Sequence, residues 1–88
     1  MTFHVQFTKA AVKELRKLDA PTAAMILGWV RKNLEGCSDP RRHGKALTAN
    51  YAGKWRYRIG DYRLLAMIRD DAILILVLHV GHRREVYK

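Results

Sequence analysis

The chain has 88 residues, in which 17 lysines and arginines against 8 acidic residues give a formal net charge of +9. This length supports one hydrophobic core, since separate domains need on the order of 50–100 residues each, so we expect a single domain over residues 1–88. The apolar share of 49 % argues against a disordered basic tail, and the excess positive charge predicts an acidic partner: nucleic acid, an anionic membrane or an acidic protein.

The single cysteine, Cys37, excludes an internal disulfide and a cysteine-based zinc site, and it suits a reducing compartment. Residues 1–5 carry neither the charged lead nor the long apolar run of a signal peptide. The longest apolar stretch, residues 72–78, is too short to span a bilayer. We therefore expect a cytoplasmic protein with no membrane partner.

The first half of the chain shows one strand pattern followed by two helix patterns. Apolar and polar side chains alternate over residues 3–7, which predicts a short strand with one buried face. Thr8 is a suitable N-cap for a helix that runs to about Leu18. Pro21 suits the first turn of a second helix that ends near Gly36. The two helices are expected to form a hairpin.

The second half of the chain has the period of two that is typical of strands. Residues 37–46 are polar and marked by glycine and proline, which predicts a loop. Three strands are expected after it, separated by tight turns at Gly60-Asp61 and Asp70-Asp71: residues 54–59, 62–69 and 72–80. The predicted order is β-α-α-β-β-β in the α+β class, with the N-terminal helical hairpin packed on a curled, mainly antiparallel four-stranded sheet.

Counting outward from the Gly60-Asp61 turn places Arg58 opposite Arg63 on one face of the sheet, with Arg56 two residues along. Like charges in that arrangement cost roughly 0.2–1 kcal/mol, and solvation alone does not select for it. A solvated basic face is the alternative interpretation, but an anion such as phosphate would relieve the repulsion. The candidate phosphate contacts on and near this face are Arg41, Arg42, Lys45, Lys54, Arg56, Arg58 and Arg63.

The C-terminal segment adds a histidine to the predicted cationic face. Continuing the alternation of the third strand places His82 there, with a structural, a catalytic and an RNA-contacting role all open. His79 is assigned a structural role, because the same register places it opposite Tyr62 on the face that the helices cover. Two cations and an aromatic ring follow and would extend the site: Arg83, Arg84 and Tyr87.

Four segments carry a resemblance to a known family: Phe7-Thr8-Lys9-Ala10-Ala11, Gly44-Lys45-Ala46-Leu47, Gly53-Lys54-Trp55-Arg56-Tyr57-Arg58-Ile59-Gly60-Asp61-Tyr62-Arg63 and Val80-Gly81-His82-Arg83-Arg84-Glu85-Val86-Tyr87. On these segments the chain resembles the RelE/ParE superfamily of bacterial toxin–antitoxin toxins, over essentially its full length. The resemblance implies the compact microbial-RNase-like fold of that family.

The resemblance also implies a function: a ribosome-dependent mRNA endonuclease of the RelE kind, which cuts codons in the ribosomal A site and so inhibits translation. In that chemistry the ribose 2′-OH attacks the neighbouring phosphorus, positive side chains stabilise the charge on the phosphoryl oxygens, and no metal or cofactor takes part. The implied partners are the 70S ribosome with its mRNA and rRNA, a cognate antitoxin with an acidic or amphipathic segment similar to RelB, and operator DNA only through the antitoxin complex.

By position, the resemblance places Arg56 and Arg58 where RelE proteins have a pair of active-site lysines. Arg63 and Arg83 match two phosphate-contacting arginines of the family, the second also proposed as the general acid. Tyr87 matches a tyrosine that orients the substrate or stacks on it. These positions include the cations that the hairpin register brings together.

The base that takes the 2′-OH proton is left open, because arginine stays protonated. His82 is one candidate and Lys54 a second, and the third possibility is that the ribosome positions the nucleophile without a strong base. The implied catalytic set is Arg56, Arg58, Arg63, His82, Arg83 and Tyr87, with Arg41, Arg42, Lys45, Lys54 and Arg84 as further RNA contacts.

The sequence leaves two other function classes open. A ParE-like toxin would poison DNA gyrase through protein–protein contact without catalysis, and the shared fold does not separate it from a nuclease. A non-catalytic toxin would act only as a co-repressor with its antitoxin on operator DNA. The opposed arginines favour the nuclease, since a gyrase inhibitor has no need for Arg58 opposite Arg63.

Overall fold

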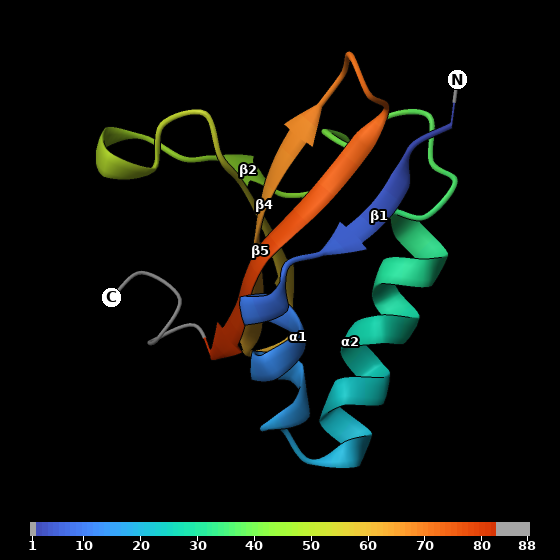
Figure 1. Cartoon of the computed structure of the whole chain (residues 1–88), viewed down its shortest axis with the longest axis vertical. Coiled ribbons are helices and arrows are strands. Elements are labelled where there is room, and N and C mark those ends of the chain that lie inside the picture. Colours follow the sequence, from blue (N-terminus) through green and yellow to red (C-terminus); the bar gives the residue numbers. More distant parts are fainter. Residues whose placement is uncertain (1, 83–88) are drawn as a thin grey trace.

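The structure, a computed structural model, describes residues 2–82. The elements in chain order are β1 (His4–Phe7), α1 (Lys9–Arg16), α2 (Ala20–Asn33), β2 (Lys45–Ala46), the 3₁₀ helix η1 (Ala49–Tyr51), β3 (Trp55–Ile59), β4 (Tyr62–Arg69) and β5 (Leu74–His82). The two α-helices follow one another as a hairpin, and α2 lies along one side of the sheet while η1 stands off on the other side (Figure 1). The predicted α+β class with an N-terminal helical hairpin is confirmed.

The described strands form a five-stranded sheet in the order β1-β5-β4-β3-β2. β1 runs parallel to β5, and the other neighbours are antiparallel. The prediction of four strands is wrong by one, because Lys45–Ala46, expected at the end of a loop, pairs with β3. Gly44 makes this approach possible: its φ is +80°, and a Cβ there would collide with the Arg56 carbonyl oxygen. A two-residue strand is too short to show a period in the sequence.

Side-chain caps begin both α-helices. Thr8 caps α1 as predicted and Asp19 caps α2, each side chain accepting a hydrogen bond from the backbone N–H three residues further on. α1 ends at Arg16 instead of at about Leu18, because the Leu18 N–H bonds to the Leu15 carbonyl in a tighter 3₁₀-type turn. Among residues 2–82, the structure has no helix with the length and apolar character needed to cross a membrane.

The core lies between the helices and one face of the sheet. Ile26 and Val30 of α2 are at most 4 % exposed and pack in one cluster with Tyr57 of β3. The Tyr57 hydroxyl donates a hydrogen bond of 2.6 Å to the Pro40 carbonyl, and burial raises the pKa of this hydroxyl, which keeps it a neutral donor. Trp55 packs against the same cluster. The prediction that Trp55 and Tyr57 belong to the core and not to a base-stacking surface is confirmed.

β4 and β5 pair in a register that differs from the predicted one. Tyr62 lies opposite His82, whereas the sequence predicts Tyr62 opposite His79. The turn between the strands takes residues 70–73 instead of two residues, and a bulge at Leu78 interrupts the ladder. Together these two features move the register by an odd number of residues, which exchanges the faces of the two histidines. His79 therefore lies on the face away from the core, and His82 lies on the core face.

Candidate functional site

The face of the sheet away from the core carries opposed arginines. β3 and β4 pair Arg58 with Arg63, and Arg56 with Leu65. This register is the one that a two-residue turn at Gly60-Asp61 predicts, and it is confirmed in every pair of the hairpin. Backbone pairing thereby places three arginine side chains on one face of two neighbouring strands.

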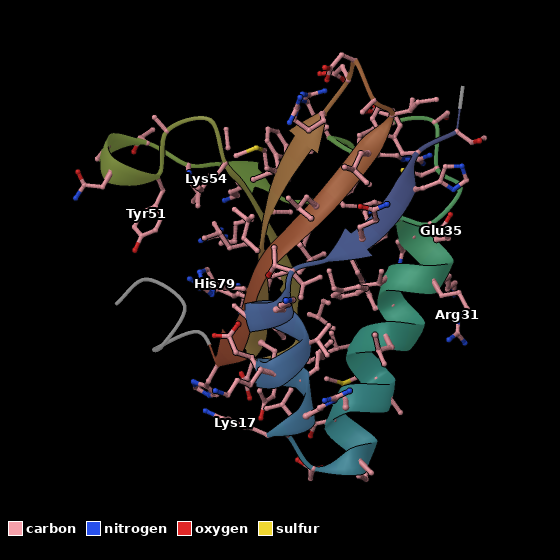
Figure 2. The ribbon with its side chains drawn as sticks, viewed as in Figure 1. Lys17, Arg31, Glu35, Tyr51, Lys54 and His79 are labelled. Carbon is pink, nitrogen blue, oxygen red and sulfur yellow. The ribbon has the colours of Figure 1, made fainter. Side chains whose placement is uncertain are left out.

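Two lysines extend this cluster. Lys45 of β2 is the direct partner of Arg56 and therefore shares its face. Lys54 lies two residues before Arg56, and its side chain points to the side of the sheet away from α2 (Figure 2). We call the cluster the arginine face and define it by five residues: Lys45, Lys54, Arg56, Arg58 and Arg63.

A buried leucine lies in the middle of the arginine face. Leu65 is 2 % exposed although it points away from the core, and it is not part of the core cluster. Its cross-strand neighbours are Arg56 and His79, and Arg63 lies two residues before it on the same strand. Leu65 is thus a buried apolar position within a face that is otherwise cationic.

Arg56 has an unsatisfied donor. Its Nε–H is buried and has no hydrogen-bond acceptor among residues 2–82. Two arginine ion pairs, Arg41 with Asp70 and Arg69 with Asp71, lie at the other end of β4 from the opposed arginines. A buried donor without an acceptor costs about 1–3 kcal/mol. The oxygen of a bound anion would supply that acceptor.

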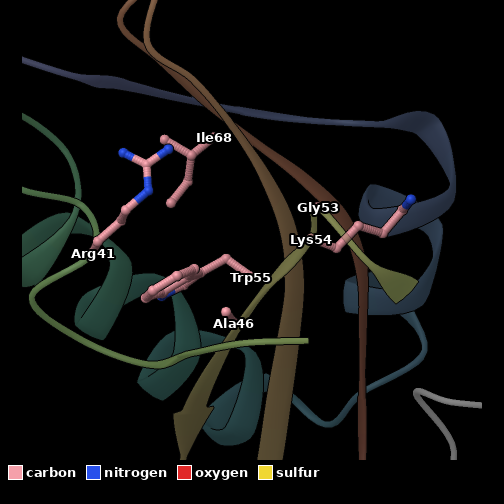
Figure 3. A pocket seen from close by; sticks show the side chains of 6 residues that line it. All are labelled: Arg41, Ala46, Gly53, Lys54, Trp55 and Ile68. Carbon is pink, nitrogen blue, oxygen red and sulfur yellow. The ribbon is translucent and has the colours of Figure 1, made fainter. Parts of the chain in front are cut away.

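Arg41 is not on the arginine face. Its guanidinium donates to both carboxylate oxygens of Asp70, at 3.0 and 2.8 Å, which holds the pKa of Asp70 below its usual value and that of Arg41 above it. Arg41 lies beside Trp55 and Ile68 in a pocket of about 210 Å³, and Lys54 points away from these side chains (Figure 3). Asp70 therefore neutralises this predicted phosphate contact on the core side of the sheet.

Arg42 also lies apart from the arginine face. It is exposed and lines a hollow of about 510 Å³ at the C-terminal end of α2, together with Lys32 and Asn33. Of the predicted RNA contacts outside β3 and β4, the structure brings Lys45 and Lys54 to the arginine face and leaves Arg42 away from it.

A pocket of about 400 Å³ continues the arginine face around the edge of the sheet. β2 pairs with β3 only at Trp55 and Arg56, which leaves the edge of β3 open at Arg58. The rings of Trp29 and His43 meet edge to face at 5.7 Å on one side of the pocket. Its lining is Trp29, His43, Gly44, Lys45, Arg56 and Arg58. The sequence does not predict either aromatic residue as part of a site, because their contact is made only by the long-range fold.

His79 and His82 occupy the reverse of their predicted places. His82 packs edge to face on Tyr62, with ring centroids 5.7 Å apart, on the core side. His79 is exposed on the other side (Figure 2), and its Nδ1 lies 3.3 Å from a Glu14 oxygen that also accepts the Val80 N–H. The prediction that His82 joins the arginine face is therefore wrong in this structure, and so is the prediction that the helices cover His79. The long turn and the bulge are the cause.

Some predicted site residues lie outside the described residues: Arg83, Arg84 and Tyr87. Within residues 2–82, no group of three or more His, Cys, Asp or Glu side chains is placed to hold a metal ion. The described part of the candidate site carries guanidinium and ammonium groups on the arginine face, with the imidazole of His79 on the same side of the sheet.

Known proteins resemble the chain over nearly its whole length. Residues 5–87 match the family described as ParE toxin of type II toxin-antitoxin system, parDE. Toxin RelG of Mycobacterium tuberculosis is 34 % identical over 88 residues, which cover 100 % of this chain and 99 % of that protein. Toxin RelE of the same organism is 30 % identical over 86 residues, which cover 98 % of this chain and 87 % of that protein.

A solved structure shares the fold in detail. It is the crystal structure of the toxin–antitoxin complex RelBE2 from Mycobacterium tuberculosis, in which the matching chain is 34 % identical to this one. The two superpose with a TM-score of 0.85, and the match covers 94 % of this chain and 100 % of the other. The sheet that carries the opposed arginines thus belongs to a fold that has been determined by crystallography in a relative.

Proposed function

The chain belongs to the RelE/ParE superfamily of toxins from type II toxin–antitoxin systems, and we propose that it is a ribosome-dependent endoribonuclease that cuts mRNA codons in the ribosomal A site. One observation supports this most strongly. Arg58 and Arg63 face each other beside Arg56, whose buried Nε–H has no acceptor among the described residues. The oxygens of a phosphodiester fit such a cluster, because charge-assisted hydrogen bonds to them satisfy the donor and offset the repulsion.

The reaction that suits this site is an internal transesterification of RNA. The ribose 2′-OH attacks the adjacent phosphorus, and the products are a 2′,3′-cyclic phosphate and a free 5′-OH. Arg56, Arg58 and Arg63 hold the phosphate and stabilise the negative charge that grows on its oxygens in the transition state. The nucleophile comes from the substrate itself, so the protein needs only to bind, orient and move protons.

The proposed partners follow from charge and from a relative. A net charge of +9 suits binding to rRNA and mRNA on the 70S ribosome, with a strong dependence on salt. The RelBE2 structure is a toxin–antitoxin complex, and we extend that assembly to this chain. A cognate antitoxin with an acidic or amphipathic segment would then neutralise the toxin in the cytoplasm, and operator DNA would be contacted only through that complex.

A gyrase inhibitor of the ParE kind is the second candidate, since the matching family is described as ParE toxin. Inhibition through protein–protein contact gives no reason to oppose Arg58 and Arg63, an arrangement that costs roughly 0.2–1 kcal/mol. A toxin that acts only as a co-repressor has no use for it either. Phosphate binding does use it, which is why the nuclease is preferred.

Primer extension in a purified translation system tests the proposal. Ribosomes stalled on a programmed mRNA are incubated with wild-type protein, Arg63→Ala or Arg31→Ala, and naked mRNA serves as the ribosome-free control. Arg31 is exposed on α2, on the far side of the molecule from Lys54 and His79 (Figure 2), so R31A controls for the loss of a charge.

We expect cleavage in the A-site codon by wild type and R31A, and only with ribosomes present. Cleavage by R63A is expected to be about 100-fold slower, the usual loss when one charge-stabilising group is removed. Uncut mRNA in every lane overturns the nuclease proposal. Gyrase-dependent DNA cleavage is then the assay that tests the second candidate.

A further inference from the structure

We propose that His79 is the catalytic base of this site and that Glu14 is its positioning residue. The inference rests on the proposed ribonuclease function and assigns the proton transfer that the arginines leave open. Guanidinium groups stay protonated, so Arg56, Arg58 and Arg63 bind phosphate but do not take the 2′-OH proton. Imidazole is the side chain that exchanges a proton near neutral pH.

The register brings His79 to the arginine face. His79 lies opposite Leu65, and Arg63 is its diagonal neighbour, because Arg63 pairs with Gly81 two residues along β5. Diagonal neighbours on one face of a strand pair are about 7–8 Å apart, which lets one phosphodiester reach both long side chains. The opposite face holds His82 against Tyr62, so His79 is the histidine that β5 offers to the arginines.

Glu14 is itself held by the backbone of β5. β1 stops short of the end of β5, and α1 continues along the same edge of the sheet. There the Thr8 hydroxyl donates to the Leu78 carbonyl at 2.9 Å, and Glu14 Oε1 accepts the Val80 N–H at 3.0 Å. The same Oε1 lies 3.3 Å from His79 Nδ1. The carboxylate thus joins the bulged part of β5 to the imidazole.

This contact sets the chemistry of the ring. An ionised carboxylate only accepts hydrogen bonds, so Glu14 favours the tautomer of His79 that carries its hydrogen on Nδ1 and donates it. Nε2 then carries no hydrogen and is the acceptor for the substrate proton. When the proton arrives, the carboxylate stabilises the imidazolium, the role that an acidic residue has beside a catalytic histidine in other enzymes.

In the proposed step, His79 Nε2 takes the proton from the 2′-OH while O2′ forms its bond to phosphorus. The bond between phosphorus and O5′ breaks, and O5′ takes a proton from water. The imidazolium then gives its proton to the hydroxide left in the solvent. His79 is thereby neutral again, and no proton is gained or lost overall. The charged groups next to His79 are Glu14 from α1 and Arg63 from β4, and Arg56 of β3 lies one strand further along the same face, beyond Leu65.

A second His–Glu pair supplies a matched control. His4 Nδ1 lies 3.0 Å from Glu35, and Glu35 also accepts the Val5 N–H at 3.0 Å. As with Glu14, one carboxylate contacts an imidazole and a backbone N–H, although Glu35 uses its two oxygens separately. This pair lies at the start of β1, where His4 is opposite Leu74 at the other end of β5 from His79. The two pairs differ in their distance from the arginine face.

Single-turnover cleavage on stalled, programmed ribosomes, with toxin in excess, tests the two roles. His79→Gln is expected to lower the rate about 100-fold, the low end of what a general base contributes, without changing the toxin concentration needed for half-maximal cleavage. Glu14→Gln is expected to lower it about 10-fold, as for loss of a group that orients a catalytic side chain. His4→Gln and Glu35→Gln are expected to keep the wild-type rate.

The pH profile and chemical rescue separate catalysis from a structural role. The wild-type rate is expected to rise with pH and then level off, as it does for a reaction that uses a general base, and H79Q is expected to lose that rise. Free imidazole is expected to restore part of the rate of His79→Ala. Wild-type cleavage by H79Q, or a loss in H79A that imidazole does not rescue, overturns the role of His79 and leaves the arginine site standing. Failure of the wild-type protein to cleave overturns the proposed function, and this role with it.

Discussion

Arg58 of β3 and Arg63 of β4 are direct cross-strand partners, so two side chains of like charge occupy neighbouring positions on one face of the sheet. The core does not require them, because the pair next to them, Tyr57 and Leu64, is the one that is fully buried. Opposed cations lower the stability of the free protein and are useful where an anion binds between them. Their pairing therefore supports the proposed anion site, since the core gives no reason for it.

Replacing Arg58 with glutamine is expected to stabilise the free protein. Removing one of two opposed charges raises the free energy of unfolding by about 0.2–1 kcal/mol, which urea denaturation at low ionic strength measures. The gain is expected to shrink at high salt, where the repulsion is screened. Arg31→Gln removes an exposed cation from the last turn of α2 and is expected not to raise the free energy of unfolding. A less stable R58Q protein contradicts the repulsion.

Gly44 and Gly53 form a matched pair of glycines with positive φ, at +80° and +85°. A Cβ on Gly44 would collide with the Arg56 carbonyl oxygen, whereas a Cβ on Gly53 would meet nothing within 4 Å. Gly53→Ala is expected to cost about 1–2 kcal/mol for the left-handed backbone. Gly44→Ala is expected to cost about 1–3 kcal/mol more for the overlap. Equal costs in urea denaturation would contradict the close approach of Gly44 to β3.

The two hairpins differ in how far the sequence predicts them. Gly60-Asp61 forms a two-residue turn, which sets every pair across β3 and β4. In the second hairpin Ile73 has a φ of +46°, which β-branched residues rarely adopt, and no sequence pattern signals it. The bulge at Leu78 carries no glycine or proline as a marker.

This difference decides which part of the candidate site is predictable. Arg58 and Arg63 belong to the first hairpin, and their pairing follows from counting residues. His79 and His82 depend on the second, where an odd shift of register exchanges the two faces of β5. The pocket at the edge of β3 depends on contacts across the fold, such as the hydrogen bond of 2.6 Å from Trp55 Nε1 to the carbonyl of His43. Local periodicity carries no information on such contacts.

The pair of Arg41 and Asp70 gives the protein a pH dependence on the acid side. The hydrogen bonds from Arg41 lower the pKa of Asp70 from its usual 3.8. A carboxyl with a lowered folded-state pKa contributes stability above its unfolded pKa and loses that contribution as pH falls through the folded one. Arg41→Ala is expected to return the pKa of Asp70 towards 3.8, measured by carboxyl NMR titration.

Asp71 is the internal control for that titration, since its pKa is lowered by Arg69 and not by Arg41. Its titration is expected to stay where it is in R41A. If the midpoint of Asp70 does not move in R41A, the ion pair does not hold in solution. Arg41 would then be free to bind an anion, as the sequence suggests.

Substitution of Lys45 tests whether bound RNA extends from the arginine face round the edge of the sheet. It is the partner of Arg56, lines the pocket beside Arg58, and is exposed. Each cation that neutralises a phosphate of single-stranded RNA releases counterions and adds about 0.7 to the slope of log affinity against log salt. Lys45→Gln is therefore expected to weaken ribosome binding at low salt and to reduce that slope by about 0.7, measured by ribosome co-sedimentation over a salt series.

Lys13 offers the matched control for this series, because it is an exposed lysine on α1. Lys13→Gln is expected to keep the wild-type slope, since Lys13 lies on α1 and not on the arginine face. A slope that falls equally in K13Q and K45Q would mean that the protein meets the ribosome through general charge. If the slope of K45Q equals that of the wild type, Lys45 neutralises no phosphate. The RNA would then lie on β3 and β4 and would not reach the pocket.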